Sequence, residues 1–164
     1  MRWRPPAKAS SPYITAEGWR RLRDELEALW PARREVVAAL SAAAAEGDRS
    51  ENAEYIYRKK QLREMDRRIR YLQKRLDVVK PISGPPADAS RVYFGAWVRV
   101  EDEFGKQSLY RIVGADEIGP EGGSISVDSP VARALLGRAE GDEVSVSVPE
   151  GDRIMVITQI SYGP

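Results

Sequence analysis

The chain has 164 residues, of which 42% are hydrophobic and 31% are charged, and this suits one ordinary domain or two small ones with a heavily solvated surface. It contains no Cys and no His, which excludes disulfide scaffolds, thiolate and imidazole metal sites, Cys nucleophiles and Ser-His-Asp triads. The formal net charge is +1, but residues 1–80 hold 19 Lys and Arg against 12 Asp and Glu, or +7, whereas residues 81–164 hold 7 against 13, or −6.

A proline-rich segment, residues 1–12, is predicted to be a disordered arm. No later stretch has about 18 consecutive apolar residues, and the chain shows no apolar core of a secretory signal. We therefore expect no membrane span and a cytoplasmic location.

Residues 13–80 are predicted to form two long helices. From residue 32 to residue 80 there is no proline, and Gly47 is the only glycine. Two series of residues follow the alternating three-and-four spacing of a coiled-coil seam: Leu22, Leu26, Leu29, Arg33, Val36, Leu40 and Ala43, and then Leu62, Met65, Ile69, Leu72, Leu76 and Val79. The break between the two helices is Gly47-Asp48, which is too short for anything but a tight reversal, so the helices should fold back on each other as an antiparallel coiled-coil hairpin.

Two residues bear on the first helix of this hairpin. Thr15 is the expected N-cap, with Glu17 in the first turn behind it. Pro31 lies inside the first series and should kink the helix or split it into two pieces, because a proline in a helix interior has no amide N–H to donate.

The remaining residues are predicted to be a linker, 81–90, and a second domain, 91–164. Five short segments rich in β-branched residues read as strands: 91–100, 108–113, 124–127, 143–148 and 153–160. Ser129, Pro130 and Gly137 suit the cap, first position and end of a short helix. The predicted fold class is therefore α+β, with an N-terminal α-helical coiled-coil hairpin and a small C-terminal α+β domain built on an antiparallel sheet.

The hairpin turn and the residues after it, 47–54, form an acidic tip that admits two interpretations. Asp48 and Glu51 have the spacing of a capping box that opens the second helix. Alternatively, their carboxylates supply oxygen ligands to Mg²⁺. Two carboxylates cannot hold a catalytic metal alone, so in the second interpretation they complete another protein's site.

The second helix also has a one-sided row of basic residues. With Leu62 taken as heptad position a, positions b and f hold Lys60, Arg63, Arg67, Arg70 and Lys74. An ordinary solvated helix face is one explanation. Because only Glu64 and Asp66 interrupt the basic stretch, contact with the phosphates of a nucleic acid is the favoured one. Nothing in the row offers recognition of base sequence.

Several stretches of the chain resemble a known family. The stretch GDRSENAEYIYRKKQLREMDRRIRYL, residues 47–72, is similar to the tip and second arm of the bacterial Gre transcript-cleavage factors, and its Arg-Ser after Asp48 and dense basic run resemble the GreB branch. The C-terminal half agrees in YFGAWV at 93–98, YRIVG at 110–114, DEI at 116–118 and ISVDSPVARALL at 125–136. The resemblance extends over roughly Tyr13 to Tyr162.

The resemblance implies a function that the residue pattern alone does not establish. The hairpin would enter the secondary channel of RNA polymerase, and the C-terminal domain, FKBP-like in fold, would dock on the coiled coil at the channel rim through Asp128, Ser129 and Pro130. Asp48 and Glu51 would help to hold Mg²⁺ at the polymerase active site, where the 3′ end of a backtracked transcript is cleaved. The basic row would guide the extruded RNA 3′ segment.

On this view the protein is a monomer without a cofactor of its own, and it stimulates an enzyme without being one. Two alternatives stay open. A channel inhibitor of the same fold would occupy the same site without promoting cleavage, and a plain coiled-coil scaffold would have incidental charge. The Asp48–Glu51 pair favours a cleavage factor over the inhibitor, and the one-sided basic row favours either over the scaffold.

Overall fold

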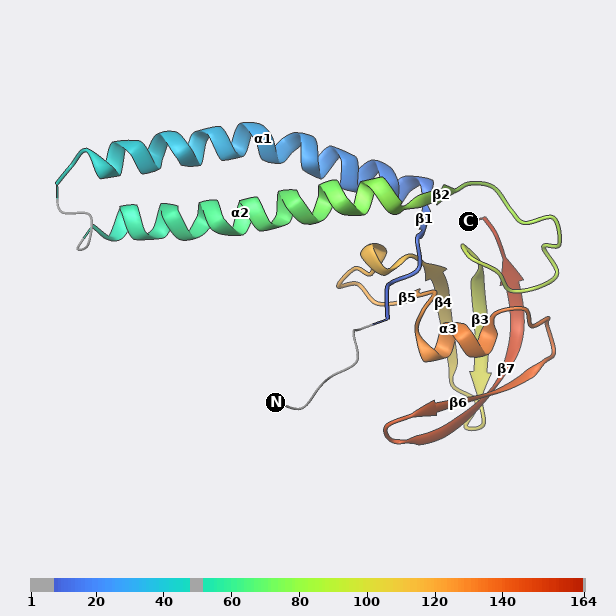
Figure 1. The fold of residues 1–164 in the computed structure, drawn as a ribbon. Coiled ribbons are helices and arrows are strands. Elements are labelled where there is room, and N and C mark those ends of the chain that lie inside the picture. Colours follow the sequence, from blue (N-terminus) through green and yellow to red (C-terminus); the bar gives the residue numbers. More distant parts are fainter. Residues whose placement is uncertain (1–7, 48–51, 164) are drawn as a thin grey trace. The chain divides into compact units, whose positions relative to one another are not determined.

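The computed structural model describes residues 8–47 and 52–163, and Figure 1 shows the helices and strands that they form. The chain forms two compact units. One is the helical region Trp19–Val79, and the other combines the residues before Trp19 with those from Lys80 onward. Asp48 and Glu51 lie outside the described residues.

The helical unit is the predicted hairpin. Helix α1 spans Ala16–Ala44 and helix α2 spans Ala53–Val78, and Figure 1 shows them side by side and antiparallel. The seam positions are the ones that the heptad spacing predicts, with these members buried: Leu22, Val36, Ala43, Ile69, Leu72 and Val79. Arg33, the polar member of the first series, donates from Nε to Asp66 Oδ1 on α2 at 2.7 Å.

Helix α1 continues without interruption through Pro31. The split into two pieces that proline allowed is therefore not found. Pro31 is exposed, on the side of the helix away from the seam, so its ring does not disturb the contact with α2.

The start of α1 is held within the other unit. Thr15 caps the helix as predicted, since its Oγ1 accepts from the Gly18 N–H at 3.0 Å. Just before it, strand β1 (Tyr13–Thr15) pairs in parallel with strand β2 (Lys80–Ile82). Neither strand was expected. The predicted linker 81–90 is wrong at its start, because Pro81 and Ile82 belong to β2, where a proline is tolerated in a two-stranded sheet that leaves one side of each strand unpaired.

The arm predicted to be disordered, 1–12, is described only from Lys8 onward. At its described end, Ser11 donates its backbone N–H to Asp128 Oδ2 at 2.8 Å, and Pro12 O accepts from the Lys80 N–H at 2.7 Å. These bonds hold Ser11 and Pro12 in place, so the prediction of disorder is wrong for these last residues of the arm.

The second unit contains a five-stranded sheet in the order β5-β4-β3-β7-β6. Its strands are β3 (Trp97–Asp102), β4 (Gln107–Val113), β5 (Ser124–Ser126), β6 (Glu143–Val148) and β7 (Gly151–Ser161). The pairs β3–β4, β3–β7 and β6–β7 are antiparallel, but β4 and β5 are parallel. The prediction of a purely antiparallel sheet is thus wrong at one edge, because residues 114–123 do not form a tight hairpin but cross back beside Arg111, so that β5 pairs in parallel with the last three residues of β4.

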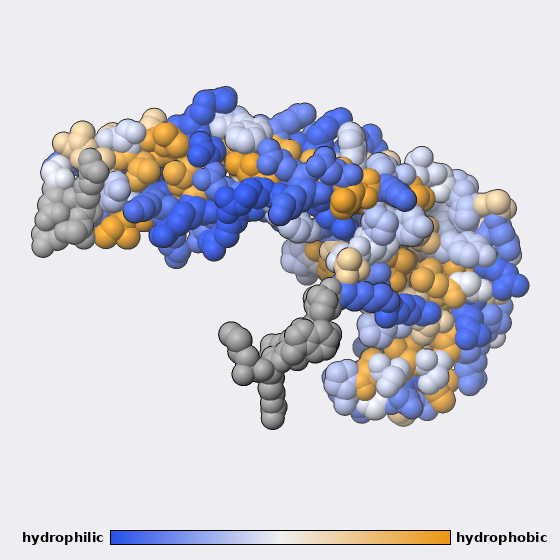
Figure 2. Space-filling view, in the orientation of Figure 1, coloured by the Kyte–Doolittle hydropathy of each residue, from blue (hydrophilic) through white to orange (hydrophobic). Residues whose placement is uncertain are grey.

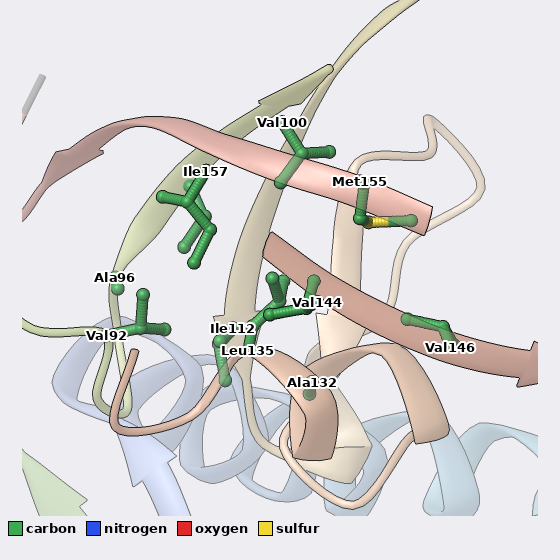
Figure 3. Close-up of a cluster of buried hydrophobic side chains, with 11 residues drawn as sticks. Val92, Ala96, Val100, Ile112, Ala132, Leu135, Val144, Val146, Met155 and Ile157 are labelled. Atoms are coloured by element: carbon green, nitrogen blue, oxygen red, sulfur yellow. The ribbon is translucent and has the colours of Figure 1, made fainter. Parts of the chain in front are cut away.

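One face of the sheet packs against the short helix α3 (Pro130–Leu135), and Figure 3 shows the resulting core. Valines alternate inward along β3 and β6, as a sheet with one buried face requires. Ser129 caps α3 as predicted, accepting from the Ala132 N–H at 3.2 Å, and Gly137 follows with φ of +79°. The buried cluster consists of Val92, Ala96, Val98, Val100, Ile112, Ala132, Leu135, Val144, Val146, Met155 and Ile157.

A buried carboxylate joins the start of α1 to the 3-10 helix Ala115–Glu117. Glu117 is only 8% exposed and accepts from the Gly114 N–H at 2.7 Å, from the Thr15 N–H at 3.1 Å and from the Thr15 hydroxyl. Its carboxylate lies directly over the Cα of Gly18, where a Cβ atom would collide with it. Glycine at 18 is therefore a packing requirement, although a helix interior otherwise disfavours it.

Among the described residues, no helix is long and apolar enough to cross a membrane.

Candidate functional site

The tip is framed by described residues on both sides. Helix α1 ends at Ala44, Gly47 has φ of +127°, and α2 begins after Asn52. The Asn52 side chain makes two bonds, because Oδ1 accepts from the Tyr55 N–H at 3.1 Å and Nδ2 donates to Ala43 O at 2.8 Å. One side chain thus caps α2 and ties it to the end of α1.

This cap corrects one interpretation of the tip. The capping-box hypothesis placed the opening of the second helix at Asp48, which lies outside the described residues. The N-cap is Asn52, and the helix starts at Ala53. Because Asn52 already satisfies an amide of the first turn, the pair Asp48 and Glu51 is not needed to open α2.

The basic row on α2 has the arrangement that the sequence predicts. Its five members, Lys60, Arg63, Arg67, Arg70 and Lys74, are all exposed. Within the ranges that the structure describes, none of the five forms an ion pair. Arg63, Arg67 and Arg70 line a shallow hollow together with Asp66. Figure 2 shows strongly hydrophilic surface along the hairpin.

Other cations of α2 are engaged within the hairpin and differ from the row in this respect. Arg68 binds Glu25 of α1 with Nε–Oε1 at 2.6 Å and Nη2–Oε2 at 2.9 Å, and this bond lowers the pKa of the Glu25 carboxyl. Arg58 binds Glu54 at 2.8 Å within α2. Arg33 of α1 donates to Asp66 of α2, and this hydrogen bond raises the pKa of the Arg33 guanidinium. Arg33, Arg58 and Arg68 thus have carboxylate partners within the hairpin, whereas the five cations of the row have none among the described residues.

The predicted docking residues lie where β5 leads into α3. Ser129 is half-buried and occupied in capping, and Pro130 is exposed at the first position of α3. Asp128 is half-buried, and its Oδ2 accepts from Ser11. Beside them, Val127 lines an apolar groove with Tyr13, Ile82, Pro85, Phe94 and Leu136. These residues are thus brought together on one surface of the sheet-containing unit.

A metal ion needs more ligands than this chain offers in its described part. No group of three or more acidic side chains that could hold a metal occurs in residues 8–47 and 52–163. The chemistry of Asp48 and Glu51 fits Mg²⁺, which prefers carboxylate oxygen and accepts one or two such ligands beside others from elsewhere.

Sequence reasoning missed two positioning residues. Asn52 directly precedes a helical run, and asparagine is among the preferred N-caps, so its capping role could have been predicted from the sequence. No sequence pattern indicates the role of Glu117, because its partners Thr15 and Gly18 are about a hundred residues away in the chain.

Comparison with known proteins agrees with the residue-level resemblance. The model "Transcription elongation factor, N-terminal" matches residues 12–80, and "Transcription elongation factor, GreA/GreB, C-term" matches residues 87–162. The transcription elongation factor GreB of Pseudomonas aeruginosa is 55% identical over 99% of this chain and 98% of its own length, and that of Xanthomonas axonopodis pv. citri is 55% identical over 98% and 97%. The factor of the same name from Yersinia pestis is 55% identical over 95% of this chain and 92% of its own. With both halves matched and these identities extending over nearly the whole length, the chain belongs to the GreA/GreB family of transcription elongation factors.

Proposed function

We propose that the chain inserts its helical hairpin into the secondary channel of RNA polymerase and stimulates cleavage of the 3′ end of backtracked RNA by the polymerase. The observation that supports this most directly is the row of five exposed cations on α2, none ion-paired within the described residues, which runs toward the acidic tip. Cations held in a line without protein partners suit the evenly spaced phosphates of a single RNA strand.

The tip is the part of the hairpin that would act at the polymerase active site. Asn52 ties the start of α2 to Ala43, and so it fixes the two ends of the segment that contains Asp48 and Glu51. Holding those ends would lower the entropy cost of placing the two carboxylates. We propose that Asp48 and Glu51 hold Mg²⁺ together with residues of the polymerase.

At such a shared site, the metal ion and this chain would have different chemical roles. Bound Mg²⁺ would supply positive charge that favours deprotonation of the attacking water and stabilises the leaving oxygen. The chain itself would supply two carboxylates and orient them, and it would contribute no general base of its own. It therefore acts as an enzyme only in combination with the polymerase.

The sheet-containing unit would hold the protein at the channel rim. Asp128, Ser129 and Pro130 lie together beside an apolar groove, and a small polar cluster next to an apolar surface suits the end of a coiled coil. The acidic charge of residues 81–164 would keep this unit away from the RNA.

A cleavage assay on stalled, backtracked elongation complexes tests the proposal. The unsubstituted chain should shorten the RNA, whereas Asp48→Ala and Glu51→Ala should bind polymerase with unchanged affinity and lose most of the stimulation, at least about a hundredfold in rate. Full activity in Asp48→Ala would refute the metal role. Binding without cleavage by the unsubstituted chain would indicate a channel inhibitor instead.

Two further variants test the other surfaces in the same assay. Neutralising Arg63, Arg67 and Arg70 together should slow the release of long 3′ fragments more than that of dinucleotides, since only long fragments reach along the row. Asp128→Arg should raise the concentration needed for half-maximal cleavage without changing the maximal rate. Equal losses on both fragment lengths, or an unchanged half-maximal concentration, would remove the corresponding surface from the proposal.

A further inference from the structure

The tip end of α2 exposes two large side chains that the proposed function does not use. Ile56 is 53% exposed and Tyr57 is 58% exposed, although both belong to the first two turns of the helix. Figure 2 shows hydrophobic surface at this end of the hairpin, next to the grey tip. Adjacent exposed apolar side chains beside an otherwise charged surface are typical of a contact site.

The position of Ile56 connects it to the basic row. Ile56 occupies heptad position b, and the spacings from it through Lys60, Arg63, Arg67, Arg70 and Lys74 are four, three, four, three and four. Residues spaced in this way lie on one face of a helix. Ile56 is therefore the tipward end of the same line, the point where the row changes from cationic to apolar. Tyr57 lies beside it, about 100° further around the helix.

The ring of Tyr57 is supported by a fixed guanidinium. Arg58 lies with its Cζ 5.5 Å from the ring centroid of Tyr57. Arg58 is itself held by two bonds, from Nε to Glu54 Oε1 at 2.8 Å and from Nη1 to Gln61 Oε1 at 3.0 Å. A ring that is backed by a restrained cation loses little freedom when a second planar group stacks on it.

We propose that Ile56 and Tyr57 receive an unpaired base of the extruded RNA 3′ segment, with the base stacked on the ring of Tyr57. Single-stranded nucleic acid is bound by cations that follow its backbone and by aromatic rings on which its bases stack, and α2 has these two elements in sequence along one side. A protein partner would explain the apolar pair but not its continuity with five solvent-facing cations. This inference rests on the proposed function, since it names the substrate contact of that same site.

The helix provides a matched control for Tyr57. Tyr71 is 43% exposed, its ring lies 5.3 Å from Arg68 Cζ, and Arg68 is held by its bonds to Glu25. Tyr71 is fourteen residues further along α2, close to four full turns, so it points to nearly the same side of the helix about 21 Å from Tyr57. It therefore also has a restrained guanidinium beside its ring but lies far from the tip.

Two measurements test the proposal with the full chain. In backtracked complexes with a short extruded RNA, Tyr57→Ala should slow cleavage about tenfold, the loss expected for one stacked base. Tyr57→Phe and Tyr71→Ala should each stay within about twofold of the unsubstituted chain. In a second measurement, RNA with 4-thiouridine at its 3′ end should crosslink to the peptide containing Ile56 and Tyr57, in an Asp48→Ala chain so that the RNA end is retained.

Several outcomes would overturn the proposal. Unimpaired cleavage by Tyr57→Ala would do so while leaving the proposed function intact, and so would crosslinking only to other peptides. Weaker binding of Tyr57→Ala to an elongation complex without extruded RNA would assign Tyr57 to a protein contact. If the unsubstituted chain failed to stimulate cleavage, the proposed function would fail, and the crosslink would still decide whether Tyr57 meets the RNA.

Discussion

The two units of the molecule stabilise themselves in different ways. The sheet-containing unit encloses a cluster of eleven buried residues between β-strands and α3. The hairpin has a single seam, and several of its seam positions, such as Leu26 and Leu40, are only half-buried. Two ion pairs also join the helices, Arg33 to Asp66 and Arg68 to Glu25. The difference teaches that the hairpin is held along one narrow seam and leaves most of its surface available for contacts, whereas the other unit is built around a closed apolar core.

The largest expected effect tests this contrast directly. Leu135→Ala in the closed core should lower the free energy of unfolding by about 3 kcal/mol, because it removes a fully buried side chain and leaves a cavity. Leu26→Ala on the half-open seam should cost about 1 kcal/mol, since the site already borders water. Urea denaturation followed by circular dichroism measures both. Equal losses would contradict the contrast between the two cores.

A second change examines the junction at the start of α1. Gly18→Ala places a Cβ against the Glu117 carboxylate, so it should destabilise the chain by about 2 kcal/mol, although the same change in an open helix stabilises by about 1 kcal/mol. The sign of the effect in thermal unfolding is the measurement. Gly18→Ala combined with Glu117→Ala should recover part of the loss. A stabilising effect of Gly18→Ala alone would show that the Glu117 carboxylate does not lie against Gly18.

A third change separates the two bonds of Asn52. Asn52→Ala should cost about 1 kcal/mol, the usual value of an N-cap. Asn52→Asp keeps an oxygen for the Tyr55 N–H but has no donor for Ala43 O, so it should retain the cap and lose the tie between the helices. Amide hydrogen exchange distinguishes them, with faster exchange in the first turn of α2 only for Asn52→Ala. Identical exchange in the two variants would argue against the cap, and an unfolding free energy of Asn52→Asp equal to that of the unsubstituted chain would argue against a separate tie.

The smallest effect concerns the ion pair of Glu25. Glu25→Gln should cost at most about 1 kcal/mol at neutral pH, because both partners are partly exposed and screened. The bond from Arg68 lowers the pKa of Glu25 in the folded chain, so its contribution is present above the ordinary pKa of glutamate and is lost as the pH falls through the lowered value. The unfolding curves of Glu25→Gln and of the unsubstituted chain should therefore differ at neutral pH and converge in acid, and a difference that persists in acid would assign the loss to packing.

The sequence predicts best where a structure depends on local periodicity. The seam of the hairpin, the cap at Thr15 and the helix after Ser129 follow from spacings within a few turns, and the structure confirms them. The pairing of short segments that are far apart in the chain is harder to predict. Tyr13–Thr15 and Lys80–Ile82 have no alternation of apolar and polar residues that would identify them as partner strands. The direction of β5 depends on the path of residues 114–123, which no local pattern determines.

The same distinction applies to the candidate site. The basic row follows from helical spacing and is exposed as predicted, whereas the role of Asn52 depends on where α1 ends. The carboxylates Asp48 and Glu51 remain a prediction from the family resemblance. Tyr57 was part of the quoted motif, but its support by Arg58, Glu54 and Gln61 needed side-chain positions.

The parallel strand pair β1–β2 and the hydrogen bonds from Thr15 to Glu117 limit how the protein can be divided into fragments. Proline and glycine in residues 81–90 suggest a cleavage point there, yet a cut after Lys80 would remove two of the three residues of β2 and leave Thr15 without its carboxylate partner. A peptide of the hairpin alone would thus have a frayed end at each terminus. Experiments that exchange tips between relatives should therefore graft within the helices, between Trp19 and Val79, and leave both strands in their native chain.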